Sequence, residues 1–281
     1  MYVVGLGIVL LIIFYLFVQN FLHKITSYKI SIPNLHSNVK GKKLVFISDT
    51  HFRERISHTF MDRILIEIEK IEPDLILFGG DIVHAASADI VIEHTKDFFF
   101  QLGKIAPTYI VYGNHDIGSD RINEITETLK RVDVHLLNNE AKWISFGEPG
   151  AGLWLMGLNE YASILNMKED LLSNIEMPKD SKNEPKILLA HHPQFFEKYL
   201  LDENKRAHII LSGHTHGGQV ILPYIGGLYA PGQGFNPSLD FGLFTSENYP
   251  DSRLIISRGL GNSGFPFRIN NRPEIITIEF E

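Results

Sequence analysis

The chain has 281 residues, a length that suits one large domain or two small ones. Apolar residues make up 44% and charged residues 21%, globular values that exclude a wholly disordered or fibrous protein. The net charge of −7 gives no general attraction for nucleic acid, and the absence of Cys excludes disulfides and thiolate metal ligands.

The first 22 residues contain no Asp, Glu, Lys or Arg, and Val3 to Val18 is continuously apolar, which is long enough for a membrane-spanning helix. A signal peptide is the alternative, but no basic residue precedes the run and no Ala-x-Ala-like cleavage site follows it. We therefore expect a transmembrane anchor over residues 1–22, a tether over residues 23–42 and a folded domain over residues 43–281.

The lysines nearest to this apolar run all follow it, beginning with Lys24 and Lys29. By the positive-inside rule we expect a single-pass protein of the cell membrane with its domain in the cytoplasm. The extracytoplasmic orientation stays open, because export machinery can override the charge signal of one short helix.

From about residue 43 the pattern is α/β. Short apolar, β-branched runs predict buried strands over residues 43–48, 75–78 and 108–112. Helices are expected between them, the first capped by Ser57 and stopped by Pro73, the second over residues 90–102. Asp120 is expected to cap a third helix, which ends at Lys130. Further strands are expected over residues 135–137, 142–144, 153–158, 186–190, 208–212, 253–257 and 274–279.

Five of these strands carry polar residues at their carboxyl ends, where ligands bind in sheet proteins of this kind. The residues are Asp49 and His51, Asp81, Asn114 and His115, His191, and His214 and His216. The donors are all oxygen or imidazole nitrogen, which suits Mn, Fe or Zn better than Mg or Ca. With four or five of the His as ligands, at least seven donors are present, which are too many for one tetrahedral ion but suffice for two ions if a carboxylate bridges them, and Asp81 is the candidate bridge.

Together these motifs resemble those of the calcineurin-like metallophosphoesterase superfamily. The matching runs are Asp-Thr-His at 49–51, Gly-Asp at 80–81, Gly-Asn-His-Asp at 113–116, His191, and Gly-His-Thr-His at 213–216. The tail at 257–268 resembles the branch of small membrane-anchored or exported bacterial phosphodiesterases. The resemblance implies a four-layer αββα sandwich, with two mixed sheets flanked by helices.

The resemblance also implies residue roles. One metal ion would take Asp49, His51, Asp81 and His216, and the other would take Asp81, Asn114, His191 and His214. His115 would donate a proton or contact phosphate, with Asp116 orienting its ring. Two divalent ions, Mn²⁺ favoured over Fe or Zn, would then activate a water as hydroxide to hydrolyse a phosphodiester or pyrophosphate.

Some residues depart from the pattern or stay ambiguous. His84 stands where many members of the superfamily carry a second Asp, and a surface position is the favoured interpretation. His192 competes with His191 for one ligand position and is taken as a turn residue. Arg258 and Arg268 could grip a phosphate, but structural ion pairs are at least as well supported.

The substrate is not readable from the residues. The anchor favours a phosphate ester that is lipid-linked, and some anchored relatives cleave UDP-2,3-diacylglucosamine. A metallo-β-lactamase-type hydrolase is disfavoured, because no Asp-His follows His216. A metal-binding scaffold without activity is the non-enzyme alternative, but every ligand motif is intact.

Overall fold

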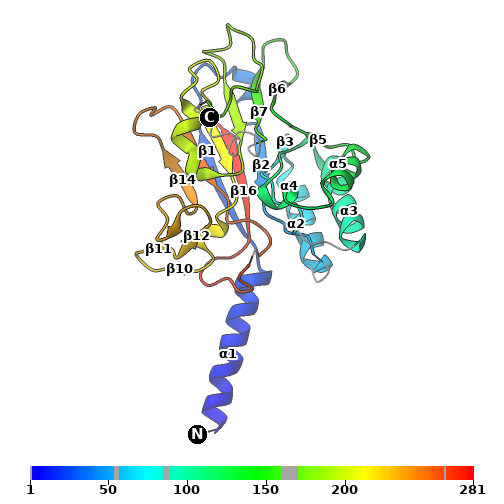
Figure 1. Ribbon diagram of the computed structural model, residues 1–281, viewed down its shortest axis with the longest axis vertical. Coiled ribbons are helices and arrows are strands. Elements are labelled where there is room, and N and C mark those ends of the chain that lie inside the picture. The colour runs from blue at the N-terminus through cyan, green and yellow to red at the C-terminus, as the bar shows by residue number, and fades with distance from the viewer. Residues whose placement is uncertain (1, 54–56, 85–88, 160–169, 263) are drawn as a thin grey trace.

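A computed structural model describes residues 2–53, 57–84, 89–159, 170–262 and 264–281 (Figure 1). Helix α1 (Tyr2–Phe21) projects from a domain that, in these ranges, contains two six-stranded sheets. The first sheet has the order β1 (Lys24–Ile30), β16 (Glu274–Phe280), β2 (Lys43–Ile47), β3 (Leu75–Phe78), β4 (Thr108–Ile110) and β5 (His135–Leu136). The second has the order β14 (Gly242–Thr245), β15 (Arg253–Ile256), β9 (Ile209–Ser212), β8 (Lys186–Leu189), β7 (Gly152–Gly157) and β6 (Glu140–Ser145).

Both sheets are mixed. Strands β2 to β5 run parallel, as do β7, β8, β9 and β15, while β16, β6 and β14 bring in antiparallel pairs. Parallel neighbours end at the same edge of a sheet, so the loops after β2, β3 and β4 face those after β8 and β9. The two mixed sheets expected from the sequence are confirmed.

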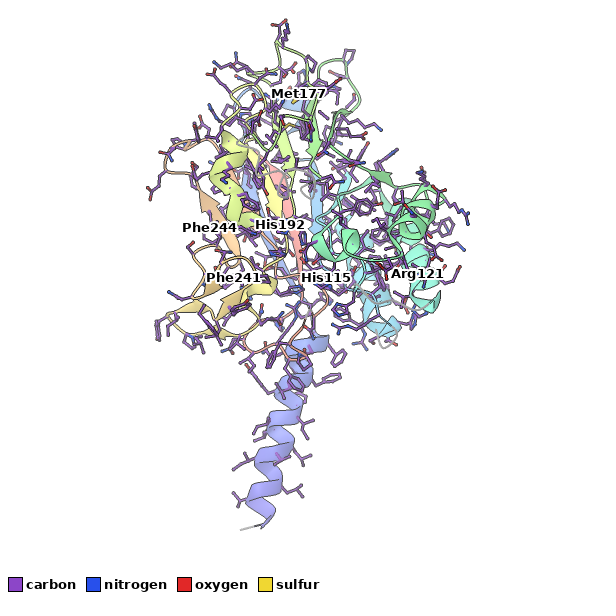
Figure 2. All side chains as sticks on the ribbon, in the orientation of Figure 1. His115, Arg121, Met177, His192, Phe241 and Phe244 are labelled. Carbon is purple, nitrogen blue, oxygen red and sulfur yellow. The ribbon has the colours of Figure 1, made fainter. Side chains whose placement is uncertain are left out.

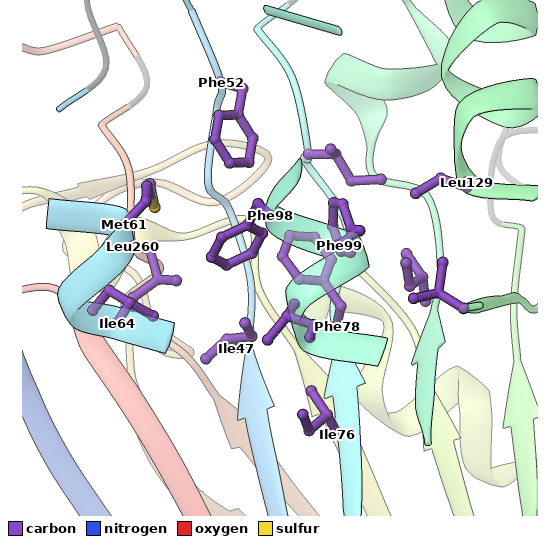
Figure 3. Close-up of a cluster of buried hydrophobic side chains, with 14 of the residues drawn as sticks. Ile47, Phe52, Met61, Ile64, Ile76, Phe78, Phe98, Phe99, Leu129 and Leu260 are labelled. Atoms are coloured by element: carbon purple, nitrogen blue, oxygen red, sulfur yellow. The ribbon is translucent and has the colours of Figure 1, made fainter. Parts of the chain in front are cut away.

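Helices cover the outer face of the first sheet: α2 (His58–Ile71), α3 (Asp89–Ile105) and α5 (Ile122–Lys130). Figure 3 shows the core beneath them, where Ile47 and Phe78 of the sheet meet Phe98 and Phe99 of α3. A second apolar cluster fills the space between the sheets. The outer face of the second sheet is covered by the 3₁₀ helix η2 (Pro193–Leu200) and neighbouring turns, which completes the four layers.

Short elements complete the described chain. They are η1 (Ser37–Val39), α4 (Asn114–Ile117), η3 (His216–Gly218) and two hairpins, β10 (Ile221–Leu222) with β11 (Gly226–Gly227) and β12 (Tyr229–Ala230) with β13 (Gly234–Phe235). Figure 1 places these hairpins at the end of the domain from which α1 projects. Ser57 caps α2 as predicted, by accepting a hydrogen bond from Phe60 N at 3.3 Å. Asp120 does not cap α5, whose N-cap is Arg121.

The region expected to be a tether is partly folded. Residues Lys24 to Ile30 form β1, which pairs in parallel with β16 over its whole length, from Lys24 opposite Glu274 to Ile30 opposite Phe280. Only Ile30 is fully buried, and the preceding side chains alternate between exposed and half-buried. A tether over residues 23–42 is therefore wrong for this segment, because backbone pairing with a distant strand orders a chain that has few apolar side chains.

Candidate metal centre

The candidate ligands converge at the carboxyl ends of strands from both sheets. They are Asp49 and His51 after β2, Asp81 after β3, Asn114 after β4, His191 after β8, and His214 and His216 after β9. Six of them are buried, and Asn114 is exposed at the start of α4. Side chains held on strand ends of a packed core are well placed to form a rigid site.

The buried ligands fall into two groups that share one carboxylate. Asp49, His51, Asp81 and His216 each offer a ligand atom, and these atoms lie within 4.8 Å of one another. Asp81 also forms such a group with His191 and His214. Asp81 Oδ2 lies 3.4 Å from His51 Nε2 and 3.3 Å from His191 Nε2, so one oxygen faces both groups.

The backbone at these positions is unusual. Asp49, His51, Asp81, His214 and His216 all have positive φ, between 44° and 71°. The left-handed region costs a non-glycine residue about 1–3 kcal/mol and persists only where the surroundings enforce it. Hydrogen bonds across the centre supply that enforcement, because His214 N donates to Asp49 Oδ1 at 3.0 Å and His51 N donates to Asp81 O at 3.1 Å.

Backbone carbonyls orient two of the imidazoles. His191 Nδ1 lies 2.7 Å from Gly79 O, and His216 Nδ1 lies 3.2 Å from Gly261 O. A protonated Nδ1 that donates to a carbonyl leaves Nε2 with a free lone pair, as in histidine ligands of metals. In both residues that Nε2 faces a carboxylate, that of Asp81 or Asp49.

Burial favours the neutral form of three imidazoles of the centre, those of His51, His214 and His216. Burial lowers the pKa of His51 to about 3 and holds the pKa values of His214 and His216 well below the usual range. Burial alone would raise the pKa of Asp81, but the His191 and His51 rings beside it lower it well below its ordinary value. Neutral imidazoles and ionised carboxylates are the forms that bind metals, so this donor set fits divalent ions such as Mn²⁺, Fe²⁺ or Zn²⁺.

The Gly-Asn-His-Asp motif is placed differently from the sequence expectation in one respect. Asp116 does not orient the His115 ring, because its oxygens accept from the backbone amides of Ile82, Val83 and Gly113 at 2.8–3.0 Å. Burial raises the pKa of Asp116 to about 7. Asp116 instead joins the loops that follow β3 and β4, and so fixes the position of Asp81 indirectly.

Two histidines that the sequence did not assign to the site lie against it. The ring of His84 stacks on that of His115, with centroids 5.1 Å apart and planes at 25°. His115 in turn meets His51 edge-on at 4.7 Å, and His192 lies 4.3 Å from His214. Figure 2 shows His115 and His192 near the middle of the domain, where the two sheets meet. Their positions in the sequence could have indicated this, because His84 follows Asp81 by three residues and His192 follows His191 directly.

The arginines of the tail serve the structure of the centre. Arg268 is fully buried and donates to the carbonyls of Arg258, Gly259 and Gly261. Gly261 N donates to Asp49 O at 2.6 Å, so the loop that Arg268 holds packs directly on a candidate ligand. Arg258 lies over the Phe241 ring, 4.1 Å from its centroid, and pairs with Glu274 at 3.8 Å.

Buried carboxylates and imidazoles above the ends of two packed sheets, together with the comparisons that follow, define a metal-dependent phosphoester hydrolase. The sequence profile of the calcineurin-like phosphoesterases matches residues 42–218. The chain belongs to that family, as the motifs predicted. Members of the family use a dinuclear site for divalent metals, and the Asp and His groups described above are consistent with one.

Curated relatives support the assignment. Phosphodiesterase YaeI of Escherichia coli is 30% identical over 246 residues, covering 86% of this chain and 83% of its own. A metallophosphoesterase of Helicobacter pylori is 28% identical over 84% of this chain and 59% of its own length. A Bos taurus transmembrane protein with a metallophosphoesterase domain is 26% identical over 89% of this chain, which spans 55% of that relative.

Proposed function

We propose that the protein is a phosphodiesterase or pyrophosphatase with two divalent ions at the centre. Asp49, His51, Asp81 and His216 would hold one ion, and Asp81, Asn114, His191 and His214 the other. The observation that carries this proposal is the Asp81 carboxylate, which belongs to both groups of ligand atoms. Two such ions would lower the pKa of bound water towards neutrality and neutralise charge on the phosphoryl oxygens.

We propose that His115 protonates the leaving oxygen of the substrate. It is half-buried at the first turn of α4, its ring meets His51 edge-on, and its backbone N donates to Asp81 Oδ1 at 2.9 Å. A protonated imidazole at this place would give its proton to the leaving oxygen, which usually contributes a factor of ~10²–10⁴ to the rate. Mn²⁺ is the ion that we favour, with Fe or Zn as alternatives.

The Asp81→Asn variant tests the centre, with Asp74→Asn as its matched control. Asp74 precedes β3 and accepts from Lys42 Nζ at 2.8 Å, whereas Asp81 follows the same strand at its other end. We expect Asp81→Asn to lose at least one metal ion and nearly all hydrolysis of bis-p-nitrophenyl phosphate, and Asp74→Asn to retain both. Near-normal turnover of Asp81→Asn with two ions bound would contradict the proposal. Metal binding without hydrolysis in the unmodified protein would favour the scaffold alternative.

Helix α1 supports a membrane location. Val4 to Phe21 is apolar and long enough to cross a bilayer, and no residue of this window is fully buried. We place the domain on the cytoplasmic side, on the strength of the lysines that follow the helix. A substrate linked to a lipid, such as UDP-2,3-diacylglucosamine, suits an anchored enzyme. Protease added to intact cells tests the orientation, because digestion without permeabilisation would place the domain outside.

A further inference from the structure

Polar side chains near the end of α1 hold the helix against the domain. Tyr15 OH donates to Asn270 Oδ1 at 2.8 Å, and Gln19 Oε1 accepts from Asn271 N at 2.9 Å. Asn20 Oδ1 accepts from Asn262 Nδ2 at 3.0 Å. The last turns of an otherwise apolar helix are therefore docked on the segment that leads into β16, and this docking fixes where a membrane would lie.

The same segment touches the metal centre. Asn271 Nδ2 donates to His216 O at 2.7 Å, and Gly261 O faces His216 Nδ1. Asn271 thus contacts both Gln19 of the helix and His216 of the ligand set. The distance from the bilayer surface to the metal centre is consequently set by the fold rather than by a flexible linker.

Two adjoining cavities lie along this contact. The first, which we name the α1 groove, has a volume of about 500 Å³ and is lined mainly by apolar side chains: Ile13, Leu16, Phe17, Phe21, Pro266 and Phe267. The second, the inner pocket, has a volume of about 410 Å³ and reaches Thr50, His51 and Arg53. Both are lined by Asn20, Phe21, Asn262 and Pro266, so the apolar groove adjoins a pocket of mixed lining that includes His51, a candidate metal ligand.

The exposed residues around the groove suit a bilayer better than water. Phe17, Phe21 and Phe267 are 50%, 40% and 45% exposed. The nearby hairpins also present Tyr224 and Phe235, which are almost fully and 76% exposed, at the end of the domain from which α1 leaves (Figure 1). Aromatic side chains gather at membrane interfaces in this way. The exposed apolar rim of the groove is therefore suited to contact with lipid.

We propose that the α1 groove binds an acyl chain of a membrane lipid whose phosphoester reaches the metal centre through the inner pocket. The substrate class is then an amphiphilic lipid phosphoester that leaves the bilayer sideways along α1. This inference rests on the proposed function for the chemistry at the centre, but the groove itself is defined by α1 together with Asn262, Pro266 and Phe267. Arg53, which lines the inner pocket and donates to Asn262 O, places a positive charge on the path of the phosphate.

The test uses two diesters that differ only in chain length, methyl p-nitrophenyl phosphate and hexadecyl p-nitrophenyl phosphate. Full-length protein is reconstituted in phosphatidylcholine vesicles, and kcat/KM is measured for each substrate. We expect Phe17→Ser and Phe267→Ser to lower kcat/KM for the hexadecyl ester about tenfold and to leave the methyl ester unchanged. Phe14→Ser is the matched control, because Phe14 is exposed on α1 but does not line the groove. An equal decrease of kcat/KM for the hexadecyl ester in all three variants, or no decrease in any, would contradict acyl-chain binding in the groove.

A second measurement separates this inference from the proposed function. Phosphatidylcholine that carries a diazirine in its acyl chain is photolysed in the same vesicles, and labelled peptides are mapped. If labelling of residues 264–267 decreases in Phe17→Ser but not in Phe14→Ser, the groove binds acyl chains. Should neither diester be hydrolysed in the same protein, only the proposed function is contradicted. Hydrolysis of both diesters without labelling of residues 264–267 would reject the groove and leave the proposed function standing.

Discussion

One added methyl group at Gly113 should disable the centre without removing any donor. Gly113 has φ −101° and ψ −179°, an extended conformation that alanine adopts freely. An alanine Cβ there would lie 2.2 Å from Asp81 Oδ1 and 2.5 Å from Asp81 N. Because non-bonded contacts prefer about 3.5 Å, the carboxylate would have to move by more than about 1 Å. A displacement of ~1 Å at a catalytic group can cost ~10²-fold, so we expect kcat/KM to fall about a hundredfold.

The assay for Gly113→Ala combines metal content by elemental analysis with hydrolysis of bis-p-nitrophenyl phosphate by the full-length protein in detergent. Gly264→Ala is the control, because its Cβ would meet no atom within 4 Å. Gly213→Ala should behave like Gly113→Ala, since its Cβ would lie 2.3 Å from Asp49 Oδ2. Thermal unfolding shows whether each variant is folded. A folded Gly113→Ala with two ions and unchanged kcat/KM would refute the reasoning that Asp81 must stay in place.

Three further predictions follow from other parts of the molecule. His115→Gln should keep its metal content and slow hydrolysis most for basic leaving groups, so that equal losses for p-nitrophenolate and alkoxide esters would argue against proton donation. Burial lowers the pKa of His208 to about 4, below its unfolded value, so the unfolded chain binds a proton more readily between pH 6.5 and 4. Acidification through this window should lower the free energy of unfolding by up to about 1.4 kcal/mol per pH unit, and His208→Asn should show a shallower dependence in urea titrations. A variant that lacks residues 1–22 should stay folded and hydrolyse small diesters. A variant that lacks residues 1–30 should unfold at a lower temperature, because it also loses β1, the partner of β16.

The parts of the fold that could be read from the sequence are those buried on both faces. Strands β2 and β3 are continuous apolar runs because sheets or helices cover them on each side, and such runs stand out against the polar loops. The polar residues that end these runs then mark the site. Asp49, Asp81 and His191 could therefore be predicted as neighbours without any knowledge of the loops between them.

Strand β1 could not be found by the same rule. Its sequence, KITSYKI, has one fully buried side chain, because the strand lies at the edge of the first sheet. What orders it is backbone pairing with β16, which follows about 250 residues later in the chain. Edge strands commonly carry lysines and polar residues that keep the edge from pairing with other molecules, so composition alone favoured a tether.

The roles of Asp116 and His84 depended on how two loops approach each other. Residue spacing places Asp116 beside His115 in the chain, but the first turn of α4 directs its carboxylate back to the amides of Ile82 and Val83. The same approach brings His84 onto the ring of His115. Neither contact follows from a local pattern, because each requires the loops after β3 and β4 to be packed together.

Residues 258–262 and 264–271 connect three features that lie far apart in the sequence. Arg268, fully buried, gathers the carbonyls of this segment, and its own backbone N donates to Asn20 Oδ1 at 3.3 Å. Through Gly261 and Asn271 the segment also contacts Asp49 and His216. Helix α1 and the metal centre therefore share one supporting segment, which the carbonyl contacts of Arg268 and the Asn271–His216 bond also hold without the helix. This shared segment gives a physical reason for the position of the helix to depend on the fold of the hydrolase domain.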